Sequence, residues 1–306
     1  MGFFMSNLEN KLKKIINTFN NINRNVGYED IKKLSLKYYK NINVLNVLAQ
    51  IAQKMGDVDT AINSYKRILL IDKNNIELLS KIYKLFLTKS SLDEALEKIN
   101  LILVIDKGHY EATRDKAYIY LLKNNFDCAK KYIDNIPKLK ENDFFAYNIK
   151  GLIYFKKNSF HEAKNYFEQA IKLNSKYIDS YNNLGVCLLE LEKLDEACTV
   201  FKEAHVIDSN NPKTLINLGN VLSLKDNTLE AIQYYNKALA LDPNNQEILS
   251  NIAISYCRDN KQKEAKIFYD KAIKINPYDY KLKYAYCTLQ LKLNNFSSSW
   301  ELFDSR

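Results

Sequence analysis

The chain has 306 residues, 46% of them hydrophobic, and a net charge of +9 that is spread along its length without a run of five like charges. A nucleic-acid-binding surface needs basic residues gathered on one face, so this pattern argues against a nucleic-acid partner. No stretch approaches the roughly 18 apolar residues of a membrane span, so we expect no membrane association. Only 7 glycines and 4 prolines occur, which is typical of an almost wholly helical chain.

The five cysteines lie inside helical patterns and form no Cys-x-x-Cys pair. An odd number without a spacing motif is typical of reduced thiols, so we expect a cytoplasmic location. The N-terminus also lacks the basic segment followed by an apolar run that marks a secretory signal.

The first elements in chain order are a short leader, residues 1–7, and an atypical helix pair over residues 8–41. Helical periodicity begins near Leu8, breaks in the Asn-rich stretch 20–25 and resumes at about Tyr28. This pair has the length of the units that follow but lacks their regularly placed small residues. We therefore expect it to be an end unit of a repeat array.

From Ile42 onward the sequence has a period of 34 residues, most visibly in one alanine per unit. The alanines are Ala61, Ala95, Ala129, Ala163, Ala197, Ala231 and Ala265. The predicted units are 42–75, 76–109, 110–143, 144–177, 178–211, 212–245 and 246–279, followed by a partial unit over 280–306. Strict placement of a small residue indicates that two helices touch there.

Two further columns keep the same period. A second column of small residues, interrupted by Tyr83, comprises Ala49, Ala117, Gly151, Gly185, Gly219 and Ala253. A third column is aromatic or aliphatic and comprises Tyr65, Ile99, Ile133, Phe167, Phe201, Tyr235 and Tyr269. Glycine in a helix costs about 1 kcal/mol relative to alanine, so we expect the glycines to mark contact between backbones.

Two units end in a dipeptide with proline, Asp-Pro at Pro243 and Asn-Pro at Pro277. With these dipeptides and the three columns, the units resemble tetratricopeptide repeats. The resemblance implies an all-α fold, a right-handed α-solenoid of stacked antiparallel helix pairs. Unit 110–143 departs from the pattern, because Lys116 and Lys140 replace the residues that are typical at their repeat positions. In addition, Pro137 shortens the second helix of this unit. We expect the stack to bend or loosen there.

No catalytic motif is present: there is no Gly-rich phosphate loop, no Ser/His/Asp arrangement and no metal-ligand spacing. The three histidines, His109, His161 and His205, fall at three different repeat positions and cannot form one cluster by symmetry. We therefore predict no catalytic residues, no metal site and no cofactor. We also predict that this part of the chain is not an enzyme.

The resemblance also implies that first helices line a concave groove. On that face Asn183, Asn217 and Asn251 recur at 34-residue spacing, with Asn182 and Asn220 beside them. We call the three recurring residues the asparagine ladder; it is similar to that of O-linked N-acetylglucosamine transferase repeats. Side-chain amides suit a peptide backbone of any sequence, which favours a protein or peptide ligand. The alternative is that asparagine is simply abundant in this chain.

The last segment carries the only tryptophan of the chain. Its pattern, with Phe296, Trp300, Phe303 and Arg306, resembles the segment that closes bacterial repeat arrays just before a glycosyltransferase domain. We expect a C-terminal interface there, either with a following catalytic domain or through self-association. Two functions stay open: a scaffold binding an extended peptide or a partner helix in its groove, or the substrate-recruiting arm of a glycosyltransferase.

Overall fold

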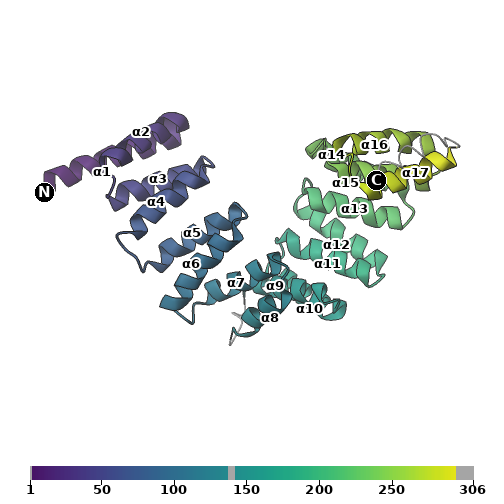
Figure 1. Cartoon of the computed structure of the whole chain (residues 1–306), viewed down its shortest axis with the longest axis horizontal. Helices are drawn as coiled ribbons and strands as arrows, with labels where there is room; N and C mark the ends of the chain where they lie inside the picture. The colour runs from purple at the N-terminus through teal and green to yellow at the C-terminus, as the bar shows by residue number, and fades with distance from the viewer. Residues whose placement is uncertain (1, 137–141, 294–306) are drawn as a thin grey trace. The chain divides into compact units, whose positions relative to one another are not determined.

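The computed structural model describes residues 2–136 and 142–293, and within these ranges the chain contains helices and short connections but no strand (Figure 1). The chain divides into two compact units, 1–138 and 139–306. Each unit is a stack in which every helix packs against its neighbours in sequence. This confirms the predicted all-α fold of stacked helix pairs.

Within residues 2–136 the first unit contains nine elements. They are α1 (Gly2–Asn17), the π-helix η1 (Thr18–Ile22), α2 (Arg24–Lys37), α3 (Ile42–Lys54), α4 (Val58–Leu69), α5 (Ile76–Thr88), α6 (Leu92–Ile105), α7 (Tyr110–Leu122) and α8 (Phe126–Asp134). The predicted shortening of the second helix in unit 110–143 is confirmed, because α8 has 9 residues whereas α6 has 14.

The second unit contains nine described helices. They are α9 (Phe144–Lys156), α10 (Phe160–Leu173), α11 (Ile178–Glu190), α12 (Leu194–Ile207), α13 (Pro212–Leu224), α14 (Thr228–Leu241), α15 (Gln246–Arg258), α16 (Gln262–Ile275) and α17 (Tyr280–Lys292). From α3 onward, odd-numbered helices are the first helices of the repeats and even-numbered helices are the second. No helix in the described ranges is long and apolar enough to cross a bilayer.

The N-terminal pair differs from its prediction at its edges. Its first helix begins at Gly2 instead of near Leu8, and the second begins at Arg24 instead of near Tyr28. A Cβ added to Gly27 would lie 2.7 Å from the backbone and Cβ of Phe19, so this glycine allows the close contact that the periodic small residues provide elsewhere. The expectation that the pair lacks such a residue was therefore wrong.

Helix starts and turns repeat every 34 residues as well. Most first helices are capped by a side chain that accepts a backbone N–H three residues ahead: Asn41, Asn75, His109, Asp143, Asn211, Asn245 and Asp279. The turn between the two helices of each repeat contains one left-handed residue: Gly56, Ser90, Asn124, Asn158, Glu192, Asp226 and Asn260.

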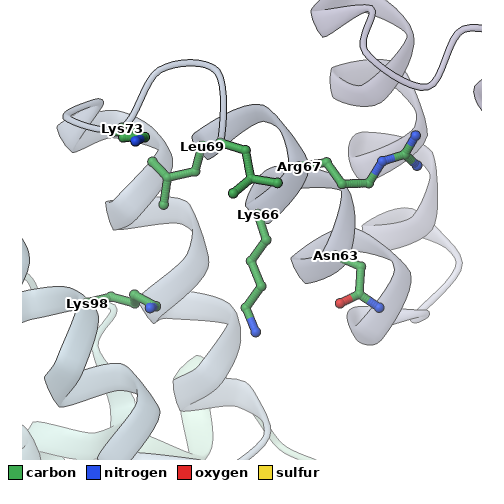
Figure 2. A pocket seen from close by; sticks show the side chains of 7 residues that line it. Asn63, Lys66, Arg67, Leu69, Lys73 and Lys98 are labelled. Atoms are coloured by element: carbon green, nitrogen blue, oxygen red, sulfur yellow. The ribbon is translucent and has the colours of Figure 1, made fainter.

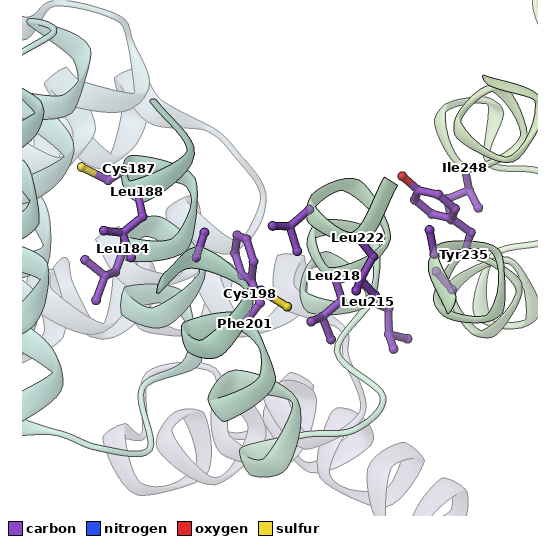
Figure 3. Packing of buried hydrophobic residues seen from close by; sticks show 14 of the residues in the cluster. Leu184, Cys187, Leu188, Cys198, Phe201, Leu215, Leu218, Leu222, Tyr235 and Ile248 are labelled. Atoms are coloured by element: carbon purple, nitrogen blue, oxygen red, sulfur yellow. The ribbon is translucent and has the colours of Figure 1, made fainter. Parts of the chain in front are cut away.

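The repeat core is built where the three predicted columns meet. All seven periodic alanines are fully buried. A Cβ on Gly185 would lie 2.3 Å from the Phe201 ring, and a Cβ on Gly219 would lie 2.3 Å from the Tyr235 ring. The glycines therefore seat aromatic rings of the second helix and not another backbone, which corrects the sequence-based expectation. Figure 3 shows the buried hydrophobic cluster to which the Phe201 and Tyr235 rings belong.

Candidate functional site

The asparagine ladder lies on the first helices of the second unit and is part of a hydrogen-bonded network between repeats. Asn183 on α11 donates from Nδ2 to Oδ1 of Asn148 on α9, over 3.0 Å. Asn217 on α13 donates to Oδ1 of Asn182 on α11 over 3.2 Å. Asn251 on α15 donates to Oδ1 of Asn220 on α13 over 3.2 Å. The structure thus brings together all five predicted groove residues.

Two of the three acceptors in this network are more buried than the donors, and the third, Asn220, is half-buried like them. Asn148 and Asn182 are buried, and each accepts a second bond from a hydroxyl of the next first helix: Ser180 Oγ at 3.1 Å and Thr214 Oγ1 at 3.2 Å. The sequence analysis missed Asn148, Ser180 and Thr214 as members. Their own 34-residue spacings, Asn148 to Asn182 and Ser180 to Thr214, are the signal that could have found them.

Asn220 is held from the neighbouring second helix. The hydroxyl of Tyr235 on α14 donates to Asn220 Oδ1 over 2.6 Å. Burial raises the pKa of Tyr235 far above its usual value, so the hydroxyl stays protonated and remains a donor at any physiological pH. Asn220 therefore receives two hydrogen bonds on one oxygen and is fixed in orientation.

The ladder side chains keep hydrogen-bonding capacity after forming these contacts. Asn183, Asn217 and Asn251 are half-buried, and each uses one amide hydrogen within the network. A second amide hydrogen and the carbonyl oxygen of each remain for a ligand. Asn182 differs, because its Nδ2 is buried without a partner in the described part of the chain. The chemistry of the surface is that of neutral donors and acceptors at a fixed spacing.

The ladder ends at α17, where Ala285 takes the place of the next asparagine. Two adjoining hollows, of about 290 and 340 Å³, open between α15 and α17 and share Ile254, Tyr269 and Ala285 as walls. Their remaining walls include Leu282 and Leu289. Each hollow is large enough to receive one side chain of a bound segment.

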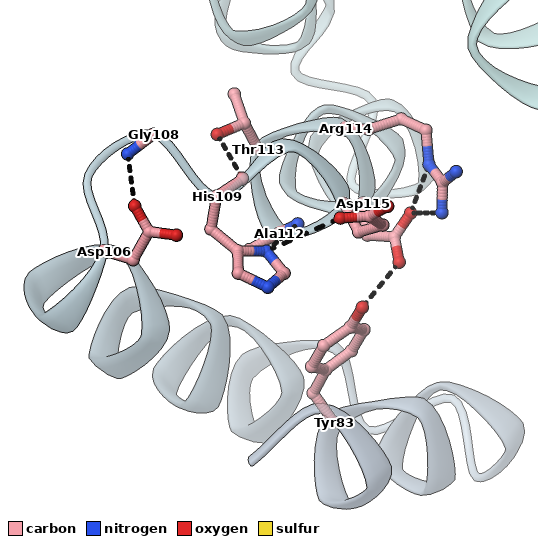
Figure 4. Close-up of polar contacts among 9 residues, drawn as sticks. Tyr83, Asp106, Gly108, His109, Ala112, Thr113, Arg114 and Asp115 are labelled. Atoms are coloured by element: carbon pink, nitrogen blue, oxygen red, sulfur yellow. Dashed lines mark hydrogen bonds and ion pairs between the residues drawn. The ribbon is translucent and has the colours of Figure 1, made fainter. Parts of the chain in front are cut away.

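The repeat position of the ladder asparagines holds a buried, charged residue on α7 of the first unit. Asp115 on α7 is buried, accepts from the Tyr83 hydroxyl over 2.8 Å and pairs with Arg114 at 2.7 Å (Figure 4). Burial, followed by the nearby charge of Asp115, raises the pKa of Tyr83 far above its usual value. Beside them, buried Lys116 donates to Asn100 Oδ1 over 2.6 Å. Arg114 is thus bound to an internal carboxylate.

The predicted C-terminal interface, Phe296, Trp300, Phe303 and Arg306, lies outside the described residues. In the described part of the chain, no three His, Cys, Asp or Glu side chains gather as metal ligands.

Comparison with protein families finds one kind of match. Models described as tetratricopeptide repeat match residues 42–75, 146–177, 176–244 and 234–267, together about half of the chain. No curated protein matches the sequence.

Several solved structures share the fold of this chain. A tetratricopeptide repeat protein from Parabacteroides merdae is 18% identical, with a TM-score of 0.67 over 81% of this chain and 98% of that chain. YrrB, described as having an unusual peptide-binding site, is 22% identical, with a TM-score of 0.50 over 61% of this chain and 96% of that chain. The Cut9–Hcn1 structure is 15% identical, with a TM-score of 0.67 over 89% of this chain and 53% of that chain. Identities this low establish the fold alone.

Proposed function

This chain belongs to the tetratricopeptide repeat family, and we propose that it is a non-catalytic scaffold whose asparagine ladder binds an extended peptide segment of a partner protein. The observation that carries the proposal is the set of hydrogen bonds that fixes Asn183, Asn217 and Asn251 across successive first helices. Amides held in this way are oriented before the ligand arrives, which lowers the entropy lost on binding.

The chemistry of the ladder favours an extended segment over a partner helix. An α-helix satisfies its backbone N–H and C=O groups internally, so it has few left for side-chain amides. An extended segment presents unpaired backbone groups at regular spacing, and the second amide hydrogen and the oxygen of each ladder residue complement them. The hollows beside Ile254 and Ala285 would take side chains of the same segment.

The test starts from peptides selected from a random library against the whole chain, with affinity measured by fluorescence anisotropy. The triple variant Asn183→Ala, Asn217→Ala and Asn251→Ala should weaken binding at least ten-fold, because each lost hydrogen bond costs about 0.5–1.5 kcal/mol. The matched control replaces Asn165 and Asn236, which are exposed on second helices, and should leave affinity unchanged. Equal affinities for parent and triple variant, with an intact helical signal, would refute the proposal.

The second function, the recruiting arm of a glycosyltransferase, is supported only by the sequence pattern at Phe296, Trp300, Phe303 and Arg306. Its test is the coding sequence beyond Arg306. Several hundred residues with alternating strand and helix patterns would support it, whereas an immediate stop codon would exclude a covalently attached catalytic domain.

A further inference from the structure

A second surface with binding character lies on the second helices of the first unit. Large aliphatic side chains are exposed at the C-terminal ends of α4 and α6; Leu70 is 75% exposed and Val104 76%. The full set, which we call the α4–α6 apolar patch, is Leu70, Ile71, Leu101, Val104 and Ile105. Exposed apolar residues that gather on one face mark an interaction site more often than single ones do.

The repeat fold does not require Leu70, Leu101 and Val104 to be apolar, whereas Ile71 and Ile105 belong to a column that is Leu or Ile in every repeat. At the positions equivalent to Leu101 and Val104, α14 carries Lys237 and Ala240. At the same positions α16 carries Lys271 and Lys274. The repeat frame therefore does not explain the apolar character of Leu70, Leu101 and Val104; α12 carries an exposed Val206 at the position of Val104, but Glu203 stands there at the position of Leu101.

A hollow of about 600 Å³ opens between α4 and α6 beside the patch (Figure 2). Four basic side chains and no acidic one line the hollow. The lining residues are Asn63, Lys66, Arg67, Leu69, Leu70, Lys73 and Lys98. Leu70 belongs to both the patch and the hollow, so the two form one surface.

Two of the four cations are engaged within the protein. Arg67 donates to the backbone oxygen of Tyr39 over 2.6 Å, and Lys98 pairs with Glu97 at 2.7 Å. Lys66 and Lys73 are exposed, and no carboxylate in the described ranges pairs with either. Lys66 lies 5.3 Å from the centre of the Phe86 ring. The hollow therefore has a local positive charge available to a partner.

From this surface we infer a docking site for an amphipathic helix of a partner protein that carries Asp or Glu beside its apolar stripe. The apolar stripe covers Leu70, Leu101 and Val104, one side chain enters the hollow, and the flanking carboxylates meet Lys66 and Lys73. A helix suits this site because, apart from Asn63, no amide lines the hollow for an extended backbone. A bilayer surface would cover the patch but leave the recessed hollow unfilled.

The inference can be tested by methyl NMR on the full chain labelled at Ile, Leu and Val. The probe is a peptide of about 18 residues, long enough to form a helix, with Leu on one face and Glu on its flanks. Titration should shift the methyl signals of Leu70, Leu101 and Val104 and leave those of Leu222 and Ile248 in the second unit unchanged. A peptide of the same pattern with Lys in place of Glu should produce no shift.

Variants assign the charge contribution. Lys66→Glu with Lys73→Glu should weaken binding of the acidic probe about ten-fold, through loss of attraction and gain of repulsion. Lys202→Glu is the matched control, because Lys202 is exposed at the repeat position of Lys66 on α12, and it should have no effect. Leu70→Ser, at an exposed site, should weaken binding without changing the melting temperature.

Three outcomes would overturn the inference. The first is the absence of methyl shifts at millimolar probe, and the second is equal shifts with the Lys-bearing peptide. The third is sedimentation with phosphatidylserine vesicles that depends on Leu70 and Val104, which would make the surface a lipid-binding one. None of these results bears on the asparagine ladder, which lies on first helices of the other unit.

Discussion

The ladder position has opposite chemistry on α7 of the first unit and on α11, α13 and α15 of the second. In the second unit it holds Asn183, Asn217 and Asn251, neutral side chains that are half-buried and retain bonding capacity. On α7 of the first unit it holds Asp115, which is buried and bound to Tyr83 and Arg114, while α3 and α5 carry Val47 and Lys81 there. One backbone geometry therefore supports either half-buried neutral amides or a buried ionic contact, and the side chains decide which.

Core packing follows a related contrast. In the second unit a glycine on the first helix faces a large ring, as at Gly185 and Phe201. In the first unit Tyr83 occupies the glycine position, and the residue in the ring column of that repeat is Ile99. In this one repeat the aromatic ring lies on the first helix and an aliphatic side chain on the second, whereas the other first-unit repeats keep a small residue, Ala49 or Ala117, on the first helix.

The largest effect expected from this contrast is at Asp115. Asp115→Ala should destabilise the first unit by about 3 kcal/mol, because the buried Tyr83 hydroxyl loses its acceptor and Arg114 loses its counter-charge. Asp115→Asn keeps an acceptor for Tyr83 and should cost about half as much. Urea unfolding followed by circular dichroism measures both; equal, small losses would show that the ionic contact is not important for stability.

The glycine contacts should be sensitive to a single methyl group. Gly185→Ala should cost about 2 kcal/mol, because the new Cβ would lie 2.3 Å from a ring that is fully buried and cannot move away. Ala197→Leu, at a fully buried alanine of the same repeat, should cost about 1–3 kcal/mol for the same reason. Thermal melts test both, with Ala117→Gly as a control in the first unit that changes size in the other direction. A parent-like melt for Gly185→Ala would contradict the described packing.

The ladder should contribute less to stability than to binding. Asn217→Ala removes one hydrogen bond between repeats and should lower the free energy of unfolding by about 1 kcal/mol. Thr214→Val, which removes the second donor to Asn182, should have a similar effect on stability but none on peptide affinity. If both variants weakened binding equally, the ladder would act on the ligand only through the fold.

The smallest effect concerns the turns. Glu192 has a φ of 59°, a left-handed conformation that costs a residue with a side chain about 1 kcal/mol or more. Glu192→Gly should therefore stabilise the second unit by about 0.5–1 kcal/mol, and Asn158→Gly by less, because Asn tolerates this conformation better. A decrease in melting temperature for Glu192→Gly would show that the side chain has contacts that outweigh the strain.

Periodicity made most of the fold predictable. A 34-residue repeat of Ala61 and its equivalents specifies helix pairs, and the short α8 follows from Pro137. What Gly185 contacts was not predictable, because periodicity shows that two columns are close but not which atoms fill the space. The spacing of Asn148 and Asn182 could have identified Asn148 as a member of the network, but its acceptor role depends on a hydrogen bond to the next repeat, which the spacing does not show.

The central claim, that the ladder amides contact a bound extended segment, is tested most directly through their own NMR signals. The side-chain NH₂ resonances of Asn183, Asn217 and Asn251 should shift on titration with a selected peptide, while those of Asn165 and Asn236 on second helices stay in place. Tight binding of that peptide with all three ladder resonances unmoved would contradict the account.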